Sequence, residues 1–157
     1  MSDDMSWTEE DDAAVAYELL PDWHPSLFVD AVRMGLQRLD PGALEMLRAA
    51  FVTPESADRW GDFSEARTIA NSSLKLSMSA LWAVDAPDVS YVRWVDTQAH
   101  VAPDSRLIPA ELHATLVWRP EIAVTPGSAW RLHALGDPAH PDDVPRTAIG
   151  FDPRTLG

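Results

Sequence analysis

Two histidines and two arginines in the C-terminal half of the chain have the chemistry that catalysis would need. His113 and Arg119 belong to the segment AELHATLVWRP, and Arg131 and His133 belong to the segment AWRLHALG. An imidazole inside an apolar cavity can have its pKa tuned for proton transfer, and a guanidinium can orient an anionic group. His113 or His133 is therefore the candidate base, and Arg131 or Arg119 is the candidate orienting group.

The face of the sheet on which these histidines lie decides between two interpretations. Apolar and polar residues alternate in both segments, which is the pattern of half-buried strands. This alternation puts His113 and His133 on a mixed face directed away from the helices, where they would be partly exposed residues without a catalytic role. If the face assignment is reversed, both lie inside the pocket and form the best catalytic pair. Tyr91 and Asp96 are the other ionisable candidates on strands.

Other site chemistries find little support in the residue pattern. The five histidines are scattered without an HxxxH pair, and there is no cysteine, so we expect no metal site. No G-x-S-x-G motif supports a serine nucleophile. The seven glycines stand singly, without a phosphate-binding loop. We therefore expect no cofactor. The histidines are His24, His100, His113, His133 and His140.

The elements that position the candidates follow from the period of the apolar pattern. The period is helical up to about residue 71, with helices expected over 8–20, 25–40, 41–51, 54–60 and 63–72. Thr8–Asp11, Asp40–Pro41 and Thr53–Pro54 are the expected helix starts. From about residue 74 to 136 the period is two, with two hairpins, the first turning at 85–88 around Pro87. Helices followed by antiparallel strands predict an α+β fold, with N-terminal helices packed on a curved C-terminal antiparallel sheet.

The second hairpin has a self-consistent register. Its apolar face, which must contact the helices, contains the pairs Trp118–Trp130, Leu116–Leu132 and Ala114–Ala134. A slip of one residue would put these side chains on opposite faces. We therefore expect Trp118 and Trp130 to be largely buried.

This arrangement resembles the nuclear-transport-factor-2-like superfamily, a cone-like fold with helices over one face of a curved sheet. The resemblance covers roughly residues 25–136 and rests on the order of elements and the two long hairpins. The fragments WRP (118–120) and WRLHALG (130–136) look like strand ends in such proteins. The superfamily includes ketosteroid isomerases, polyketide cyclases and proteins without known activity. The resemblance implies a cavity between sheet and helices, often dimerisation through the outer face of the sheet, and no obligatory cofactor.

Aromatic and apolar residues on the two faces are candidates for a pocket and for an interface. Five tryptophans could form an aromatic pocket or else simply fill the core, namely Trp60, Trp82, Trp94, Trp118 and Trp130. The residues expected to line the cavity are Trp82, Tyr91, Trp118 and Trp130. The mixed face interleaves apolar residues with arginine, as interface cores do, so we expect a homodimer through Val117, Arg119 and Leu135. The alternatives are a monomer with a modest apolar patch and a tail (137–157) that folds back over this face.

Negative charge is concentrated near the N-terminus. The formal net charge is -13, and residues 1–32 hold nine acidic residues and no Lys or Arg. Such a surface repels phosphates and anionic lipids, so we expect neither a nucleic acid nor a membrane as a partner. The lack of cysteine, of a secretory signal and of a long apolar run favours a soluble, cytoplasmic protein. We expect an acidic segment (1–22), one α+β domain (23–136) and a Pro-rich tail (137–157).

Three functions remain open from the sequence. We expect a non-catalytic homodimer whose cavity holds a small apolar ligand. The first alternative is an isomerase, cyclase or hydratase that uses a histidine base in the cavity. The second is a protein-interaction module acting through the acidic N-terminus. Catalysis requires an ionisable side chain that lines the cavity, so the residues around the cavity distinguish the first two.

Overall fold

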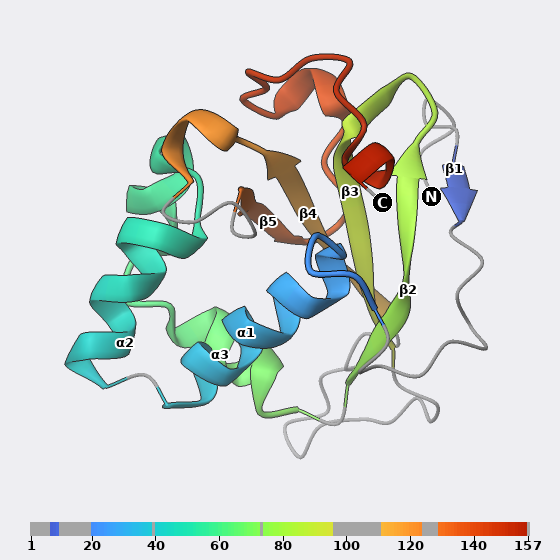
Figure 1. Cartoon of the computed structure of the whole chain (residues 1–157). Coiled ribbons are helices and arrows are strands. Elements are labelled where there is room, and N and C mark those ends of the chain that lie inside the picture. Colours follow the sequence, from blue (N-terminus) through green and yellow to red (C-terminus); the bar gives the residue numbers. More distant parts are fainter. Residues whose placement is uncertain are drawn as a thin grey trace.

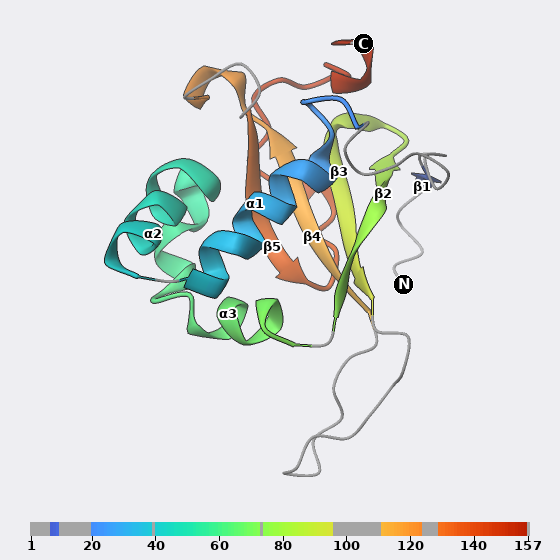
Figure 2. The same ribbon diagram turned by 60° about the horizontal axis from the view of Figure 1, so that its bottom comes forward.

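Helices lie against one face of a five-stranded antiparallel sheet (Figures 1 and 2). The computed structural model describes residues 7–9, 20–38, 40–72, 74–95, 111–123 and 129–156. Its α-helices are α1 (Pro25–Arg38), α2 (Pro41–Met46) and α3 (Ser64–Ala70). In order across the sheet, the strands are β1 (Trp7–Glu9), β2 (Lys75–Ala83), β3 (Ala86–Val95), β4 (Glu111–Trp118) and β5 (Trp130–Gly136). The predicted α+β fold is confirmed.

Short helices of other types connect these elements. The π-helical turn η2 (Leu47–Phe51) continues α2, and the 3-10 helix η3 (Pro54–Trp60) precedes α3. The 3-10 turn η4 (Pro120–Ile122) follows β4. The turns η6 (Pro141–Asp143) and η7 (Pro153–Leu156) lie in the C-terminal tail. The segments predicted to be helical from residue 25 onward are thus helical, but 54–60 is a 3-10 helix and only part of each of the others is α-helix.

One of the two cap-and-proline pairs works as predicted. The Oδ1 atom of Asp40 accepts a hydrogen bond of 2.8 Å from the backbone N–H of Ala43, and Pro41 stands at the first helical position. Thr53 does not cap η3 with its side chain. Its hydroxyl lies 2.7 Å from Oγ of Ser56 instead. The Thr53 hydroxyl also contacts His133 of β5.

Residues 7–9 form an edge strand and not the start of the predicted helix over 8–20. Trp7 pairs with Ala83, and Glu9 pairs with Leu81. The expectation that all helices precede the first strand is therefore wrong at this point, and residues 10–19 lie outside the described residues. The capping pattern is only a local signal. The outer edge of the nine-residue strand β2 offers a row of backbone donors and acceptors that a passing segment can pair with.

The turn of the first hairpin lies earlier than predicted. Val84 and Asp85 form the turn, and Pro87 lies inside β3. Pro87 is the second residue of that strand, where a missing backbone N–H disturbs the ladder least. The alternation after the turn nevertheless predicted the rest of β3.

A β-bulge interrupts the register of the second hairpin. The predicted pairs Trp118–Trp130 and Leu116–Leu132 are present. Beyond the shift between Thr115 and Leu116, however, Ala114 pairs with Leu135 instead of Ala134. A bulge inserts one residue and so moves the side chains after it to the other face. Leu135 consequently packs against the core on the helix side of the sheet.

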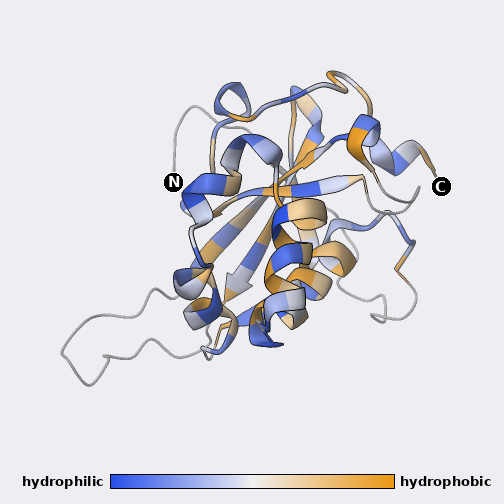
Figure 3. Ribbon diagram, turned by 90° about the vertical axis from the view of Figure 1, so that its left-hand side faces the viewer, coloured by the Kyte–Doolittle hydropathy of each residue, from blue (hydrophilic) through white to orange (hydrophobic). Residues whose placement is uncertain are grey.

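The two faces of the sheet are covered by different parts of the chain. The strands carry alternating apolar and polar bands (Figure 3). One face packs against α1, whose buried residues Phe28, Val32 and Leu36 repeat at helical spacing. The opposite face, which we call the outer face, holds a second apolar cluster that includes Val117 and Val144. Val144 belongs to the tail, so the tail folds back over the face predicted to carry a dimer interface.

Candidate functional site

The aromatic residues predicted to line a pocket fill the core. Trp82 and Trp130 are 0 % exposed, and Trp118 is 4 % exposed. The ring of Trp130 lies 5.0 Å from that of Trp118 and 5.8 Å from that of Trp82, measured between centroids. Tyr91 is equally buried but lies in the cluster on the outer face. The expected burial of Trp118 and Trp130 is confirmed, and the core interpretation of these residues holds.

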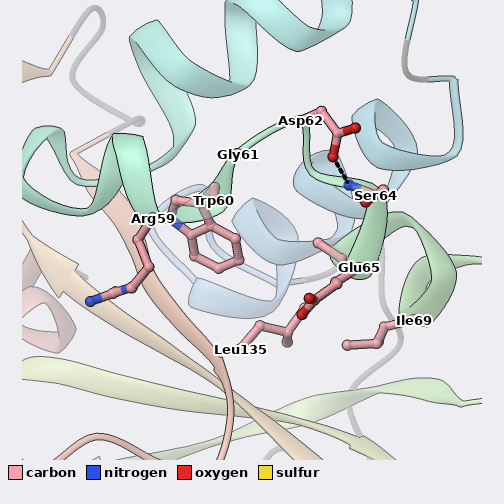
Figure 4. Close-up of a pocket in the computed structure, with 9 residues that line it drawn as sticks. Arg59, Trp60, Gly61, Asp62, Ser64, Glu65, Ile69 and Leu135 are labelled. Carbon is pink, nitrogen blue, oxygen red and sulfur yellow. Dashed lines mark hydrogen bonds between the residues drawn. The ribbon is translucent and has the colours of Figure 1, made fainter.

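A cleft opens elsewhere, between the helices and the end of β5 (Figure 4). It has a volume of about 290 Å³, and we call it the α3 cleft. Its walls come from η3, from the turn after it, from α3 and from β5. The residues lining it are Arg59, Trp60, Gly61, Asp62, Ser64, Glu65, Ala66, Ile69 and Leu135. Among them, the sequence singled out Trp60 as a possible pocket residue and Leu135 for a different role, at a dimer interface.

The turn before α3 has an unusual backbone that shapes the cleft. Gly61 has φ of 59°, and Phe63 has φ of 62°. A non-glycine residue in the left-handed region is uncommon and costs free energy. Phe63 is 1 % exposed, and its ring stacks on Trp60 at 5.8 Å with an interplanar angle of 10°. This packing holds the turn in place and sets Trp60 at the cleft.

Hydrogen bonds fix the indole of Trp60 further. Its Nε1–H donates to Oγ of Ser56 at 2.8 Å, and Ser56 in turn donates to the carbonyl of Thr53 at 3.0 Å. Thr53 and Ser56 are both 0 % exposed. The Trp60 ring is therefore a pre-formed wall of the cleft, with its orientation set by a buried network.

The charge of the α3 cleft is mainly negative. Figure 4 shows the Glu65 side chain extending between Trp60 and Leu135, while the Arg59 side chain points away from them. The Arg59 guanidinium donates to the carbonyl of His133. Asp62 accepts the backbone N–H of Ser64 at 3.0 Å, and this hydrogen bond lowers the pKa of the Asp62 carboxyl. Two carboxylates thus line the cleft, and the one guanidinium among its lining residues, that of Arg59, is held by β5. The Arg48 guanidinium lies beside the cleft, where it donates to the carbonyl of Gly61.

His133 lies at the bulge of β5, in a buried network and not in the cleft. Its Nδ1 atom is 2.8 Å from Oγ1 of Thr53, and it also hydrogen-bonds the main chain of Asp143 in the tail. Burial lowers the pKa of His133, and the Arg59 guanidinium lowers it further. A hydroxyl beside an imidazole is a nucleophile–base geometry. The Thr53 hydroxyl has no exposed surface, so no substrate reaches it in this conformation.

His113 does not form a pair with His133. The residue opposite His113 is Gly136, and the Nε2 atom of His113 lies 3.3 Å from a carboxylate oxygen of Glu111. Burial lowers the pKa of His113, while Glu111 opposes the shift. Neither histidine lines the α3 cleft. The interpretation that placed both as a catalytic pair in one pocket is therefore wrong.

The two candidate arginines hold strand ends together. Arg131 is 1 % exposed and donates to the carbonyls of Trp130, at 2.9 Å, and Ile122, at 2.6 Å. Arg119 forms ion pairs with Glu55 at 3.0 Å and Glu121 at 2.6 Å. Neither guanidinium lines the cleft, so neither is placed to orient an anion there.

The residues predicted at a dimer interface do not form one exposed surface. Val117 is 0 % exposed under the tail, Arg119 is paired with two glutamates, and Leu135 lies on the helix side. The sequence did not show that the bulge would turn Leu135 inward. Of the other candidates, Asp96 and His100 lie outside the described residues.

No family model, no curated protein and no solved structure matches the chain. Within the described ranges, no helix is long and apolar enough to cross a membrane, and no three His, Asp or Glu side chains are grouped to hold a metal ion.

Asp62 and Glu65 were not predicted as site residues, whereas Trp60 was among the tryptophans that could form a pocket. The stretch WGDF carried a signal, because Gly followed by Asp is typical of a turn. That signal indicates a turn but not a cleft, which forms only when β5 packs beside it.

Proposed function

We propose that this protein binds a small ligand in the α3 cleft and does not catalyse a reaction there. The observation that carries the proposal is the fixed Trp60 ring, which lines the cleft together with Ile69 and Leu135. Ligand pockets combine apolar and aromatic walls with a few polar groups. The volume of about 290 Å³ suits a ligand of modest size.

The charge of the cleft favours a ligand that carries a positive group. Glu65 and Asp62 provide carboxylates, and the guanidinium of Arg59 is directed to the carbonyl of His133. A cation is attracted both by carboxylates and by the face of an indole ring. The expected apolar ligand is thereby refined to a small amine with an apolar or aromatic body.

Binding is favoured over catalysis by the placement of the ionisable groups. His113, His133 and Arg131 were the candidate catalytic residues, and none of them lines the cleft. Asp62 accepts the backbone N–H of Ser64, and its lowered pKa makes it a poor proton carrier near neutral pH. The cleft therefore has aromatic, apolar and acidic side chains that can contact a ligand, but none of the candidate catalytic residues lines it.

Two further proposals concern family and assembly. The helices packed on an antiparallel sheet agree with membership of the nuclear-transport-factor-2-like superfamily, in which the space between these layers often holds ligands. A homodimer also stays a proposal. Its interface would need a surface other than Val117, which the tail covers.

Titration with benzylamine, monitored by the ¹⁵N–¹H signal of the Trp60 indole, tests the binding proposal. We expect this signal to shift, and benzoate, which has the opposite charge, to bind more weakly. Glu65→Gln should reduce the affinity for benzylamine by about threefold to tenfold, the range for an exposed charged contact. Glu45→Gln, at an exposed position of α2, is the control and should leave the affinity unchanged. An unshifted Trp60 signal at millimolar benzylamine would contradict the proposal.

A further inference from the structure

The outer face of the sheet holds the tail largely through the main chain of the tail. The Tyr91 hydroxyl donates to the carbonyl of Ala139 at 2.7 Å, and the Ala139 N–H donates to Oγ1 of Thr115 at 3.1 Å. Further along, Nη1 of Arg119 donates to the carbonyl of Pro145 at 3.2 Å. Side chains that hydrogen-bond backbone groups recognise the course of a chain and not its sequence.

Two side chains of the tail supply specific anchors. Val144 packs in the apolar cluster with Val89 and Val117, both of which are 0 % exposed. The Arg146 guanidinium binds the Asp88 carboxylate through two hydrogen bonds, of 2.8 and 3.0 Å. Asp88 is itself 0 % exposed. A buried carboxylate without a partner is strongly unfavourable, so a segment that covers Asp88 as the tail does must bring a cation to it.

The tail occupies this face without becoming part of the sheet. Within residues 137–156 there is no strand, and the regular structure consists of the short turns η6 and η7. Pro138 and Pro145 restrict the backbone and remove donors on either side of η6, which begins at Pro141. An extended, proline-containing segment held by its carbonyls can be replaced by another segment with the same features.

We propose that the outer face is a binding groove for an extended Val-Pro-Arg segment of a partner polypeptide, and that residues 137–147 occupy it as an internal competitor. The apolar pocket around Val117 accepts the valine, and Asp88 accepts the arginine two residues later. Tyr91, Thr115 and Arg119 bind the main chain on either side of the valine. The groove is separate from the α3 cleft, so this inference does not rest on the proposed ligand.

Peptide binding to a full-length chain with a weakened tail tests the groove. The probe is a fluorescent synthetic peptide of residues 137–156, and the protein is the Val144→Ala, Arg146→Ala double variant. We expect the peptide to bind this variant at least about tenfold more tightly than the wild type. In the wild type the attached tail competes at an effective concentration in the millimolar range. Fluorescence anisotropy measures both affinities, and circular dichroism checks the fold.

Two changes test the specific anchor. A peptide with Arg146→Gln, and a protein carrying Asp88→Asn in addition to the weakened tail, should each reduce peptide binding at least tenfold. Equal binding of the altered and unaltered peptides would overturn the proposed recognition of arginine by Asp88. If the double variant does not fold, the Arg146→Ala single variant replaces it in the same titration. The absence of peptide binding to a folded, tail-weakened chain would overturn the groove.

Discussion

Nδ1 of His133 lies 2.8 Å from Oγ1 of Thr53, although 80 positions separate the two residues in the chain. This contact joins the bulge of β5 to the start of η3, and the same imidazole hydrogen-bonds the main chain of Asp143. His133 thereby links sheet, helical layer and tail. Its charge state is consequently coupled to the stability of all three.

The stability of the protein should fall as the pH is lowered from 6.5 toward 5. The pKa values of His133 and His113 lie below 6.5 in the folded state, mainly because of burial. The unfolded chain therefore binds more protons than the folded chain in this window. The contribution of the two histidines to the free energy of unfolding is fully present above pH 6.5 and is lost as the pH falls below it. Each histidine can contribute at most about 1.4 kcal/mol per pH unit. Urea unfolding at a series of pH values measures the slope.

Replacement of single histidines assigns this pH dependence. His133→Gln should reduce the slope between pH 6.5 and 5, because the imidazole near Arg59 no longer takes up a proton on unfolding. His140→Gln, in the more exposed tail, should retain the slope. The lowered pKa values of Glu55 and Glu121 act only below about 4.5, so they do not contribute in this window. An unchanged slope in His133→Gln would show that His133 is not coupled to folding.

Trp118→Ala should lower the free energy of unfolding by about 3–5 kcal/mol. The Trp118 ring is 4 % exposed and contacts both Trp130 and Phe151, the latter at 5.9 Å between centroids. Chemical denaturation measures the loss. Met34→Ala, on α1 at a side chain 50 % exposed, is the control and should cost less than about 1 kcal/mol. Similar losses in both variants would contradict the core position of Trp118.

Val117→Asp should destabilise the folded chain and not simply alter its assembly. The side chain lies at 0 % exposure beneath Val144, and a carboxylate there has no partner. We expect a loss of several kcal/mol, or an unfolded protein. Val84→Asp is a matched control in the exposed turn between β2 and β3, where it should be tolerated. Sedimentation of the two variants tests the contrary result, in which the Val117→Asp chain stays folded and only the mass of its assembly changes.

Gly61→Ala should destabilise the protein by about 1–3 kcal/mol and weaken ligand binding in the α3 cleft. Gly61 has φ of 59° and ψ of -126°, a conformation that side chains with a Cβ avoid. Gly42→Ala is the control, because Gly42 lies in α2 and an added Cβ would make only ordinary contact, 3.5 Å from Asp40. It should be neutral or stabilise the protein by up to about 1 kcal/mol. Thermal unfolding distinguishes the two variants.

The sequence predicted those parts of the fold that depend on a regular period. The alternation in β4 and β5 gave the face and the register of Trp118 and Trp130, because burial on one side of a sheet leaves a period of two. The sequence could not show the bulge beside Thr115. In the pattern of apolar and polar residues, an inserted residue looks the same as an ordinary polar position. Leu135 was therefore assigned to the wrong face.

Contacts between distant segments explain the other differences. Thr8 and Glu9 were predicted to start a helix, because the local pattern does not show that β2 will pair with them. The proline content of the tail excluded long helices and strands but did not show that Arg146 would meet Asp88, 58 positions away. The α3 cleft likewise needs β5 beside α3. Local patterns predict elements, whereas a site formed by several elements depends on their packing.

The pairing of Val52 and Thr53, just before η3, with the edge strand β5 limits how copies of this protein can associate. Val52 bridges Leu132 in parallel orientation, and the Thr53 N–H donates to the Leu132 carbonyl at 2.9 Å. The Arg59 guanidinium occupies the next carbonyl, that of His133. At the other edge, β1 covers part of β2. Because these backbone groups are already engaged, a second molecule cannot extend the sheet at Leu132 and His133, and open-ended strand addition of the kind that builds fibrils is blocked there.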